Sequence, residues 1–280
     1  MTKRLLSIVL ITLFTTSTIA QDKIRGNKNV TTIETEVNSF NKIIIGEKFK
    51  ISFMKDDQAS VELKTDENLH DVIKFSVTDS ILNFKTLKRI TSRRELEIIV
   101  RYTDVLKEVE LKDNAELNSV NTVDNIDIVL KINDNARANL NLKNHSFKLV
   151  NNNDSKFSSK SRLNIESKLV DLELNESSNT EALITCDTLR VDMYQRANAK
   201  IEGDVLKIIA NTINSRNFTG KNLAVNQCEI IAEDSSDFSI QALDEITIDA
   251  SGSSEISIYG NPKITIHKFS DTARLNKKEL

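Results

Sequence analysis

Apolar and polar positions alternate on both sides of a short polar turn in the second half of the chain. The clearest copies of this pattern are Val109–Leu117, Leu130–Ala138 and Ile248–Ile256. A period of two residues is typical of β-strands, whereas helices repeat their apolar positions at i, i+3 and i+4. The pattern therefore predicts units made of a strand, a turn and a second strand.

Nine units can be aligned on the apolar residue that follows the turn. These residues span 158 positions in eight steps, about 20 residues per unit: Leu117, Ala138, Phe157, Ala182, Ile201, Phe218, Phe238, Ile256 and Leu275. A unit of this size cannot bury its own apolar face, so the units must stack. Parallel stacking at about 4.8 Å, with the usual right-handed crossover, predicts an all-β, right-handed parallel β-helix over residues 106–280. A short charged tail, Arg274–Leu280, ends it and is expected to protect the last coil.

Asparagine, aspartate and serine recur in the turns. Four positions before the aligned residue stand Asp113, Asp134, Asn153, Ser178, Ala197, Asn214, Asp234, Gly252 and Asp271. A tight bend needs left-handed or bridge-region backbone, which glycine takes freely and Asn or Asp tolerate best among other residues. The chain has 29 Asn and only six Gly, so we expect Asn and Asp to form the turns.

A charged column lies one position before the aligned residue. It contains Glu116, Arg137, Lys156, Glu181, Lys200, Asn217, Asp237, Glu255 and Arg274. Half of its neighbouring pairs have opposite charges, and each such pair across strands contributes about 0.2–1 kcal/mol. The column supports the proposed alignment.

The same alignment separates the two cysteines. Cys228 falls in an inward apolar column, and Cys186 lies about two coils away at a different phase. Two coils are about 10 Å apart, beyond the roughly 7 Å that a disulfide can bridge. We expect two free thiols, even though an oxidising compartment would permit a disulfide.

Residues 1–20 have the features of a secretory signal peptide. Lys3 and Arg4 precede an apolar stretch, and Ala20 is a small residue at a plausible cleavage point. The alternative is an uncleaved anchor, but the apolar run is about half of the roughly 20 residues that a span needs. No cysteine lies near the cut to suggest a lipoprotein. We expect an exported chain, periplasmic or at the cell surface or extracellular, with no transmembrane segment after cleavage.

Residues 21–105 are rich in strands but do not follow the repeat. Ile43–Ile45, Phe49–Phe53, Val61–Leu63 and Leu96–Val100 are predicted strands. Asp66–Ile73 suits a short helical turn, with acidic residues near its start. Because an exposed sheet edge invites aggregation, this segment is predicted to cap the open end of the β-helix.

Several short motifs resemble a known family. They are Ile24–Val30 with its Gly-Asn pair, Val37–Ile43, Asp66–Leu69 followed by Val72-Ile73, the apolar segment Ile81–Phe84, and the turn Leu111–Leu117. Together they are similar to the head GIN domain of putative auto-transporter adhesins, over roughly residues 24–260. The resemblance implies an exported β-helical protein of the Bacteroidetes type. It implies no catalytic residues.

Composition excludes several classes of protein. The net charge is −3, or −5 after loss of Lys3 and Arg4, so the basic surface that nucleic acids need is absent. Scarce Pro and Gly exclude collagen-like and linker sequences. His70, His145 and His267 form no metal-ligand spacing, and no phosphate or dinucleotide motif is present. We expect no catalytic, cofactor-binding or metal-binding residues and no cofactor.

Asp113 and Asp134 are the one pair of carboxylates that could imitate a catalytic site. Some β-helical enzymes cleave polysaccharides with acidic and basic side chains clustered on a strand face, and stacked turns could also hold calcium. The interpretation that these residues form turns is favoured, since their column elsewhere holds Asn, Ser and Gly, and a basic column lies beside them. Phe157, Phe218 and Phe238 are interpreted as core residues and not as sugar-stacking surfaces.

The sequence thus predicts an exported, non-enzymatic β-helical protein that acts as an adhesin or an envelope interaction module. Its partner would be a protein or glycan of the envelope or cell surface. The alternative is a carbohydrate-binding or carbohydrate-active β-helix similar to a polysaccharide lyase or hydrolase, which would require a groove with acidic and aromatic side chains. A third hypothesis is a periplasmic signalling or envelope-stress component.

Overall fold

The computed structural model describes residues 22–153 and 160–279. The predicted signal peptide, Lys156 and Phe157 lie outside the described residues. The strands of the N-terminal part are β1 (Lys23–Arg25), β2 (Val30–Glu36), β3 (Lys42–Ile45), β4 (Lys50–Lys55), β5 (Ser60–Asp66), β6 (Ile73–Thr78), β7 (Ile81–Thr86), β8 (Arg89–Ser92) and β9 (Leu96–Tyr102). A single 3₁₀ turn, η1 (Glu67–Leu69), is the short helical turn expected near Asp66.

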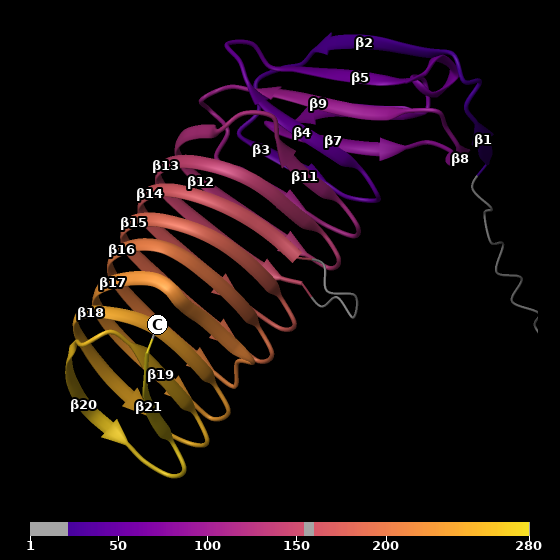
Figure 1. Ribbon diagram of the computed structural model, residues 1–280. Coiled ribbons are helices and arrows are strands. Elements are labelled where there is room, and N and C mark those ends of the chain that lie inside the picture. Colours follow the sequence, from indigo (N-terminus) through magenta and orange to yellow (C-terminus); the bar gives the residue numbers. More distant parts are fainter. Residues whose placement is uncertain (1–21, 154–159, 280) are drawn as a thin grey trace, which may run out of the picture.

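Long strands dominate the rest of the chain. They are β10 (Glu108–Leu111), β11 (Glu116–Ser119), β12 (Val123–Asn133), β13 (Arg137–Asn152), β14 (Lys160–Leu174), β15 (Asn179–Tyr194), β16 (Asn198–Ile213), β17 (Asn217–Glu233), β18 (Asp237–Ala250), β19 (Glu255–Tyr259), β20 (Lys263–Phe269) and β21 (Arg274–Lys278). Each strand from β12 to β17 pairs in parallel with the next one. The result is the predicted right-handed parallel β-helix, with about nine turns of about 19 residues (Figure 1).

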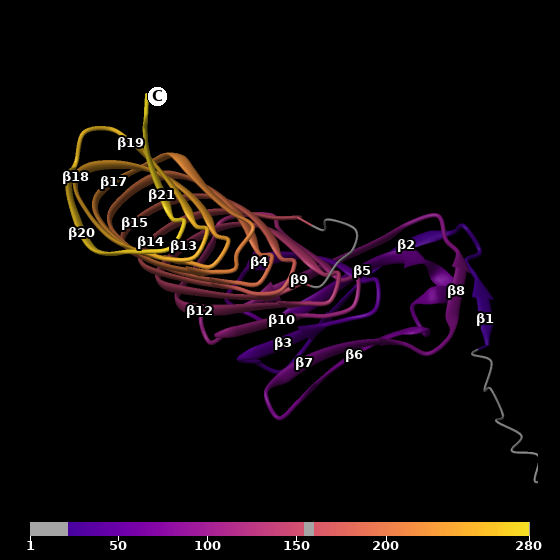
Figure 2. The ribbon, with the colours of Figure 1, turned by 90° about the horizontal axis from the view of Figure 1, so that it is seen from below.

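Each coil is a flattened loop with two arms (Figure 2). The first arm leads into a tight turn, and the second arm leads from that turn to a bend on the opposite side. Strand pairing is interrupted at the bend, at Ile126, His145, Lys168 and Asp187 on successive coils. Each long strand therefore contains the second arm of one coil and the first arm of the next.

Inward side chains of the two arms form a continuous core along the axis. Alternate residues point inward because successive side chains of a strand lie on opposite faces. Phe218 and Phe238 are buried as predicted, and their rings stack with centroids 4.4 Å apart and planes 6° apart. Neighbouring coils thus meet through identical side chains at this point.

The predicted alignment is correct at both ends of the helix but shifted by two residues in the middle. Leu117 pairs with Ala138, and Phe238 pairs with Ile256, as expected. Ala199, however, pairs with Phe218, so Thr180 and Ala199 occupy the column assigned to Ala182 and Ile201. A shift of two keeps every inward residue inward, so the apolar pattern could not reveal it.

The turns contain the left-handed backbone that the sequence predicted. Asp113, Asp134, Asn214, Asp234 and Asp271 have φ between 51° and 63°, and Gly252 has φ 71°. The prediction is wrong for Ser178 and Ala197, because Glu176 and Gln195 take the left-handed conformation in those coils. This error follows directly from the shifted alignment.

The first coil of the β-helix lies inside the segment expected to be a separate cap. β3 pairs in parallel with β10, placing Ile43 beside Val109, and β4 pairs in parallel with β11, placing Ile51 beside Leu117. Residues 56–107 form an insertion after this coil. Its strands β9 and β5 extend one arm, to which β2 from the N-terminal segment adds the last strand, and its strands β7 and β6 extend the other arm.

The charged tail contributes a strand, β21, to the last coil. β21 pairs in parallel with β19, and β20 pairs in parallel with β18, so together they make the last coil. Leu280, the final tail residue, lies outside the described residues. As far as it is described, the tail adds a strand to the helix and does not cover the end.

Both cysteines lie buried and unbridged on different coils. Cys186 pairs with Val205, and Cys228 pairs with Ile208 on the coil beyond. Burial raises the pKa of each thiol to about 12. Across the described residues, no helix is long and apolar enough to cross a bilayer.

Candidate functional site

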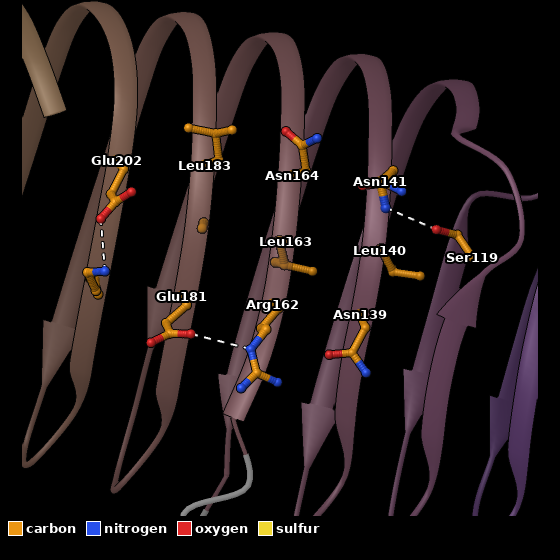
Figure 3. Close-up of a pocket in the computed structure, with 12 residues that line it drawn as sticks. Ser119, Asn139, Leu140, Asn141, Arg162, Leu163, Asn164, Glu181, Leu183 and Glu202 are labelled. Carbon is orange, nitrogen blue, oxygen red and sulfur yellow. Dashed lines mark hydrogen bonds and ion pairs between the residues drawn. The ribbon is translucent and has the colours of Figure 1, made fainter. Parts of the chain in front are cut away.

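A shallow polar groove crosses five strands on the outer face of the second arm. It encloses about 400 Å³ and runs over β11, β13, β14, β15 and β16 (Figure 3). Its floor and walls are outward side chains, which alternate with core residues such as Leu140 and Leu163. The groove is a consequence of the stacking, because each coil contributes the same outward positions.

Two parallel rows of side chains define this groove. Parallel pairing places Asn139, Arg162, Glu181 and Lys200 on successive coils in the first row. Two residues further along each strand, Asn141, Asn164, Leu183 and Glu202 form the second row. Neighbouring side chains in a row are separated by the strand spacing of about 4.8 Å.

Ion pairs hold the charged side chains of the first row. Glu181 receives Lys160 Nζ at 2.6 Å and Arg162 Nε at 3.4 Å. Lys200 Nζ lies 2.8 Å from Glu202 Oε1, which joins the two rows. The hydrogen bond from Lys160 keeps the pKa of the Glu181 carboxyl below its ordinary value, and the bond from Lys200 does the same for the pKa of Glu202. Both carboxylates are therefore ionised at neutral pH.

The second row contains side-chain amides that make no hydrogen bond to another described residue. Among the described residues, the side-chain amides of Asn141 and Asn164 have no hydrogen-bond partner, although the Asn141 backbone N–H donates to Ser119 Oγ at 3.0 Å. Leu183, half exposed, adds an apolar surface beside them. Each amide can donate and accept hydrogen bonds, so the row can bind a ligand rich in hydroxyl or amide groups.

Asp113 and Asp134 have structural roles in the tight turns, away from the groove. The backbone N–H of Glu47 donates to Asp113 Oδ2 at 2.7 Å, and the backbone N–H of Asp113 donates to Asp134 Oδ2 at 2.9 Å. Each carboxylate thus accepts a hydrogen bond from the turn of the preceding coil. This confirms the interpretation that they form turns.

The three histidines are dispersed over the molecule. His70 follows η1 and contacts Thr31 Oγ1 at 3.0 Å, His145 lies at the bend, and His267 lies on β20. Within residues 22–153 and 160–279, no three His, Cys, Asp or Glu side chains are grouped as metal ligands would be.

Sequence reasoning identified part of the first row but not the groove. Glu181 and Lys200 were placed in adjacent coils, and they do pair in register. Arg162 was missed because the alignment used Lys156 in its coil. The charged groove residues could be found from the sequence only with the correct alignment of β14 on β15, where Arg162 pairs with Glu181.

Comparisons with known proteins agree with this architecture. Residues 39–262 match the family model described as "Putative auto-transporter adhesin, head GIN domain". A crystal structure of a putative adhesin from Parabacteroides distasonis ATCC 8503 superposes with a TM-score of 0.64 at 17% identity, covering 92% of this chain and 100% of that one. No curated protein sequence matches the chain.

Two further structures have the same fold. A putative lipid binding protein from Parabacteroides distasonis ATCC 8503 has a TM-score of 0.59 at 16% identity, covering 92% of this chain and 100% of its own. A putative adhesin from Parabacteroides merdae ATCC 43184 has a TM-score of 0.59 at 16% identity, covering 92% and 99%. At this level of identity, the likeness concerns the fold alone.

Proposed function

Because the chain belongs to the head GIN domain family of putative auto-transporter adhesins, we propose that it is an exported, non-enzymatic interaction module. Its partner is a protein or glycan of the cell envelope or cell surface, and the polar groove is the binding site. The adhesin descriptions of its structural neighbours support a module of this kind.

The observation that carries the proposal is the second row of the groove. Asn141 and Asn164 present unpaired amides on neighbouring coils, flanked by charged residues whose positions are fixed by ion pairs. Because the strands that carry them are stacked in register, these amides lie at a regular spacing that suits repeated hydroxyl or amide groups, and a preorganised backbone lowers the entropic cost of binding. Extended faces of this type are the usual binding surfaces of solenoids.

A carbohydrate-active enzyme is the second candidate, and the groove does contain acidic side chains. Glycoside hydrolysis requires one carboxyl group whose pKa is raised so that it can act as a general acid. The pKa values of Glu181 and Glu202 are instead lowered by their lysine partners. The described residues that line the groove also include no aromatic ring. These features favour binding over catalysis.

The test combines glycan arrays and pull-downs of envelope proteins with two matched variants. The groove variant carries Asn141→Ala and Asn164→Ala. The control carries Asn114→Ala and Asn135→Ala, two exposed asparagines in the tight turns. Loss of two hydrogen bonds of about 1 kcal/mol each should weaken binding tenfold or more in the groove variant alone. Equal binding by both variants would place the site elsewhere, and depolymerisation of a polysaccharide by the purified chain would make it an enzyme.

Export and final location need a separate measurement. Mass spectrometry of the chain recovered from outside the cytoplasm should show an N-terminus at Gln21, since cleavage is expected after Ala20. Fractionation then distinguishes a surface adhesin from a periplasmic signalling or envelope-stress component. A chain that retains Lys3 and Arg4 would contradict cleavage.

A further inference from the structure

Both ends of the β-helix present unpaired strand edges. At the N-terminal end, β2 pairs only with β5 and β6 pairs only with β7 among the described strands. At the C-terminal end, β20 pairs only with β18 and β21 pairs only with β19. Figure 1 shows β2 and the pair β20 and β21 at opposite ends of the molecule, and Figure 2 shows β6 on the side of β2. Each end therefore carries a row of backbone donors and acceptors for another strand.

Inward side chains are exposed at these ends because no further rung covers them. Ile266 on β20 is 47% exposed, whereas Ile248, its partner one coil earlier, is fully buried. Ile33 on β2 is likewise 47% exposed, although Leu63, its partner on β5, is 3% exposed. Ile264 and Phe269 add to the apolar surface of the C-terminal end. The C-terminal end has the composition of an interrupted core, whereas on β2 the apolar Ile33 lies between Thr31 and Thr35 on the same face.

Outward charges are opposite where β21 and β2 would meet, whereas β6, the other free strand of the N-terminal end, carries Lys74 and no acidic residue. The last coil, residues 263–278, contains five Lys and Arg residues and one acidic residue, Asp271. Arg274 and Lys278 lie on the outward face of β21, because they pair with Glu255 and Tyr259 of β19. β2 contains Glu34, which pairs with Arg101 of β9 at 2.9 Å, and Glu36, and it has no basic residue. Two β21 edges would repel each other, whereas β21 and β2 are complementary in charge.

Strand directions fit a continuation of the second arm as a parallel sheet, whereas β6 is antiparallel to β7 and would pair with β20 in the antiparallel sense. β2 is antiparallel to β5, β5 is antiparallel to β9, and β9 is parallel to β4. β2 therefore runs in the direction of β4 and of the coils that follow. A β21 strand added to the free edge of β2 would extend the parallel sheet of the second arm.

We propose that copies of this chain stack head to tail, with β21 of one copy against β2 of the next. In the same contact, β20 lies against the free edge of β6. This covers Ile264, Ile266 and Ile33, and brings Arg274 and Lys278 toward Glu34 and Glu36. Since the two surfaces are different and lie at opposite ends, every added copy exposes a new pair of them. A heterologous contact of this kind does not close, and it produces a filament.

The decisive experiment uses two blocked variants of the full chain, purified after export. Ile33→Lys blocks the N-terminal surface, and Ile266→Lys blocks the C-terminal surface. Ile231→Lys, a partly exposed outward position on β17 in the middle of the solenoid, is the matched control. Circular dichroism and thermal melting establish that each variant is folded, and analytical ultracentrifugation measures its mass over a range of concentrations.

The wild type and the Ile231→Lys control should form species longer than dimers, whose length rises with concentration and falls with salt. Each blocked variant alone should be a monomer. An equal mixture of the two should form dimers and nothing larger, because it contains one usable surface of each kind. A wild type that stays monomeric overturns the proposal. So do dimers of either blocked variant alone, which would mean that like ends associate.

Discussion

Replacing Gln195 by glycine should make the β-helix more stable. Gln195 lies at the tight turn between β15 and β16 with φ 59°, and its exposed side chain makes no hydrogen bond with another described residue. A non-glycine residue in the left-handed region costs about 1–2 kcal/mol, and glycine avoids this cost. Glycine has a larger entropy in the unfolded chain, which offsets about 0.5–1 kcal/mol of that gain. The expected net stabilisation is about 0.5–1 kcal/mol.

The matched control is two residues away and should change stability in the opposite direction. Ala197 is buried with φ outside the left-handed region, so Ala197→Gly loses a buried methyl group and gains unfolded-state entropy. Together these effects cost about 1–2 kcal/mol. Glu176→Gly, in the turn of the preceding coil with φ 57°, should repeat the gain seen at Gln195.

Urea denaturation at 25 °C measures all three variants, with thermal melting as a second assay. At about 2–4 °C per kcal/mol for a chain of this size, Gln195→Gly should melt one to a few degrees above the wild type and Ala197→Gly below it. The reasoning is refuted if the two signs are exchanged. That result would place the left-handed position at Ala197, as the uncorrected alignment had it.

Three further predictions concern the core, the thiols and the turn carboxylates. Phe218→Ala and Phe238→Ala should each destabilise the fold by about 3–5 kcal/mol. Urea titrations of the double variant should reveal a coupling energy of about 0.5–1.5 kcal/mol between the stacked rings. The absence of coupling would contradict the stacking. Cys186 and Cys228 have raised pKa values of about 12 against 9.0 when unperturbed, so their burial stabilises the fold below pH 9, and this stability is lost as the pH rises from 9 to 12. Neither thiol should react with Ellman's reagent at pH 8 until the chain is unfolded, and rapid labelling of the native protein would show that a thiol is accessible. Asp134→Ala removes the acceptor for the Asp113 N–H and should lower the free energy of unfolding by about 1–2 kcal/mol. Asp134→Asn keeps an acceptor and should lower it by about 0.5 kcal/mol or less. Equal losses of stability in the two variants would exclude a role for this hydrogen bond.

The sequence predicted the β-helix because its evidence is repeated in every coil. An error in a single unit, such as the alignment on Ala182 where Thr180 occupies the column, does not change the period or the inward columns. Alignment within a coil is a harder problem, because Thr180 and Ala182 both point inward and either one fits the column. Only the backbone conformation at Glu176 and Gln195 distinguishes the two alignments, and neither residue type is typical of a left-handed turn.

The groove and the first coil were missed for different physical reasons. The groove depends on which outward side chains become neighbours across strands, and the predicted alignment placed Lys156 beside Glu181 where Arg162 is the partner in register. The first coil was missed because Ile51 and Leu117 are adjacent in space but separated by the 52-residue insertion 56–107. A search for repeats looks for paired residues about 20 positions apart in the sequence. It cannot detect two paired residues that are separated by an insertion of this length.

That insertion also determines the order in which partners become available during synthesis. β3 and β4 leave the ribosome before any later coil exists, and β7 and β9 are the first strands that can pair with them. Residues 22–107 already contain both of these pairings when Glu108 appears. The free edges of β3 and β4 can then act as a template for β10 and β11, and each later coil adds to an edge completed about 19 residues earlier. The insertion thus provides the solenoid with a starting surface, from which it grows in the direction of translation.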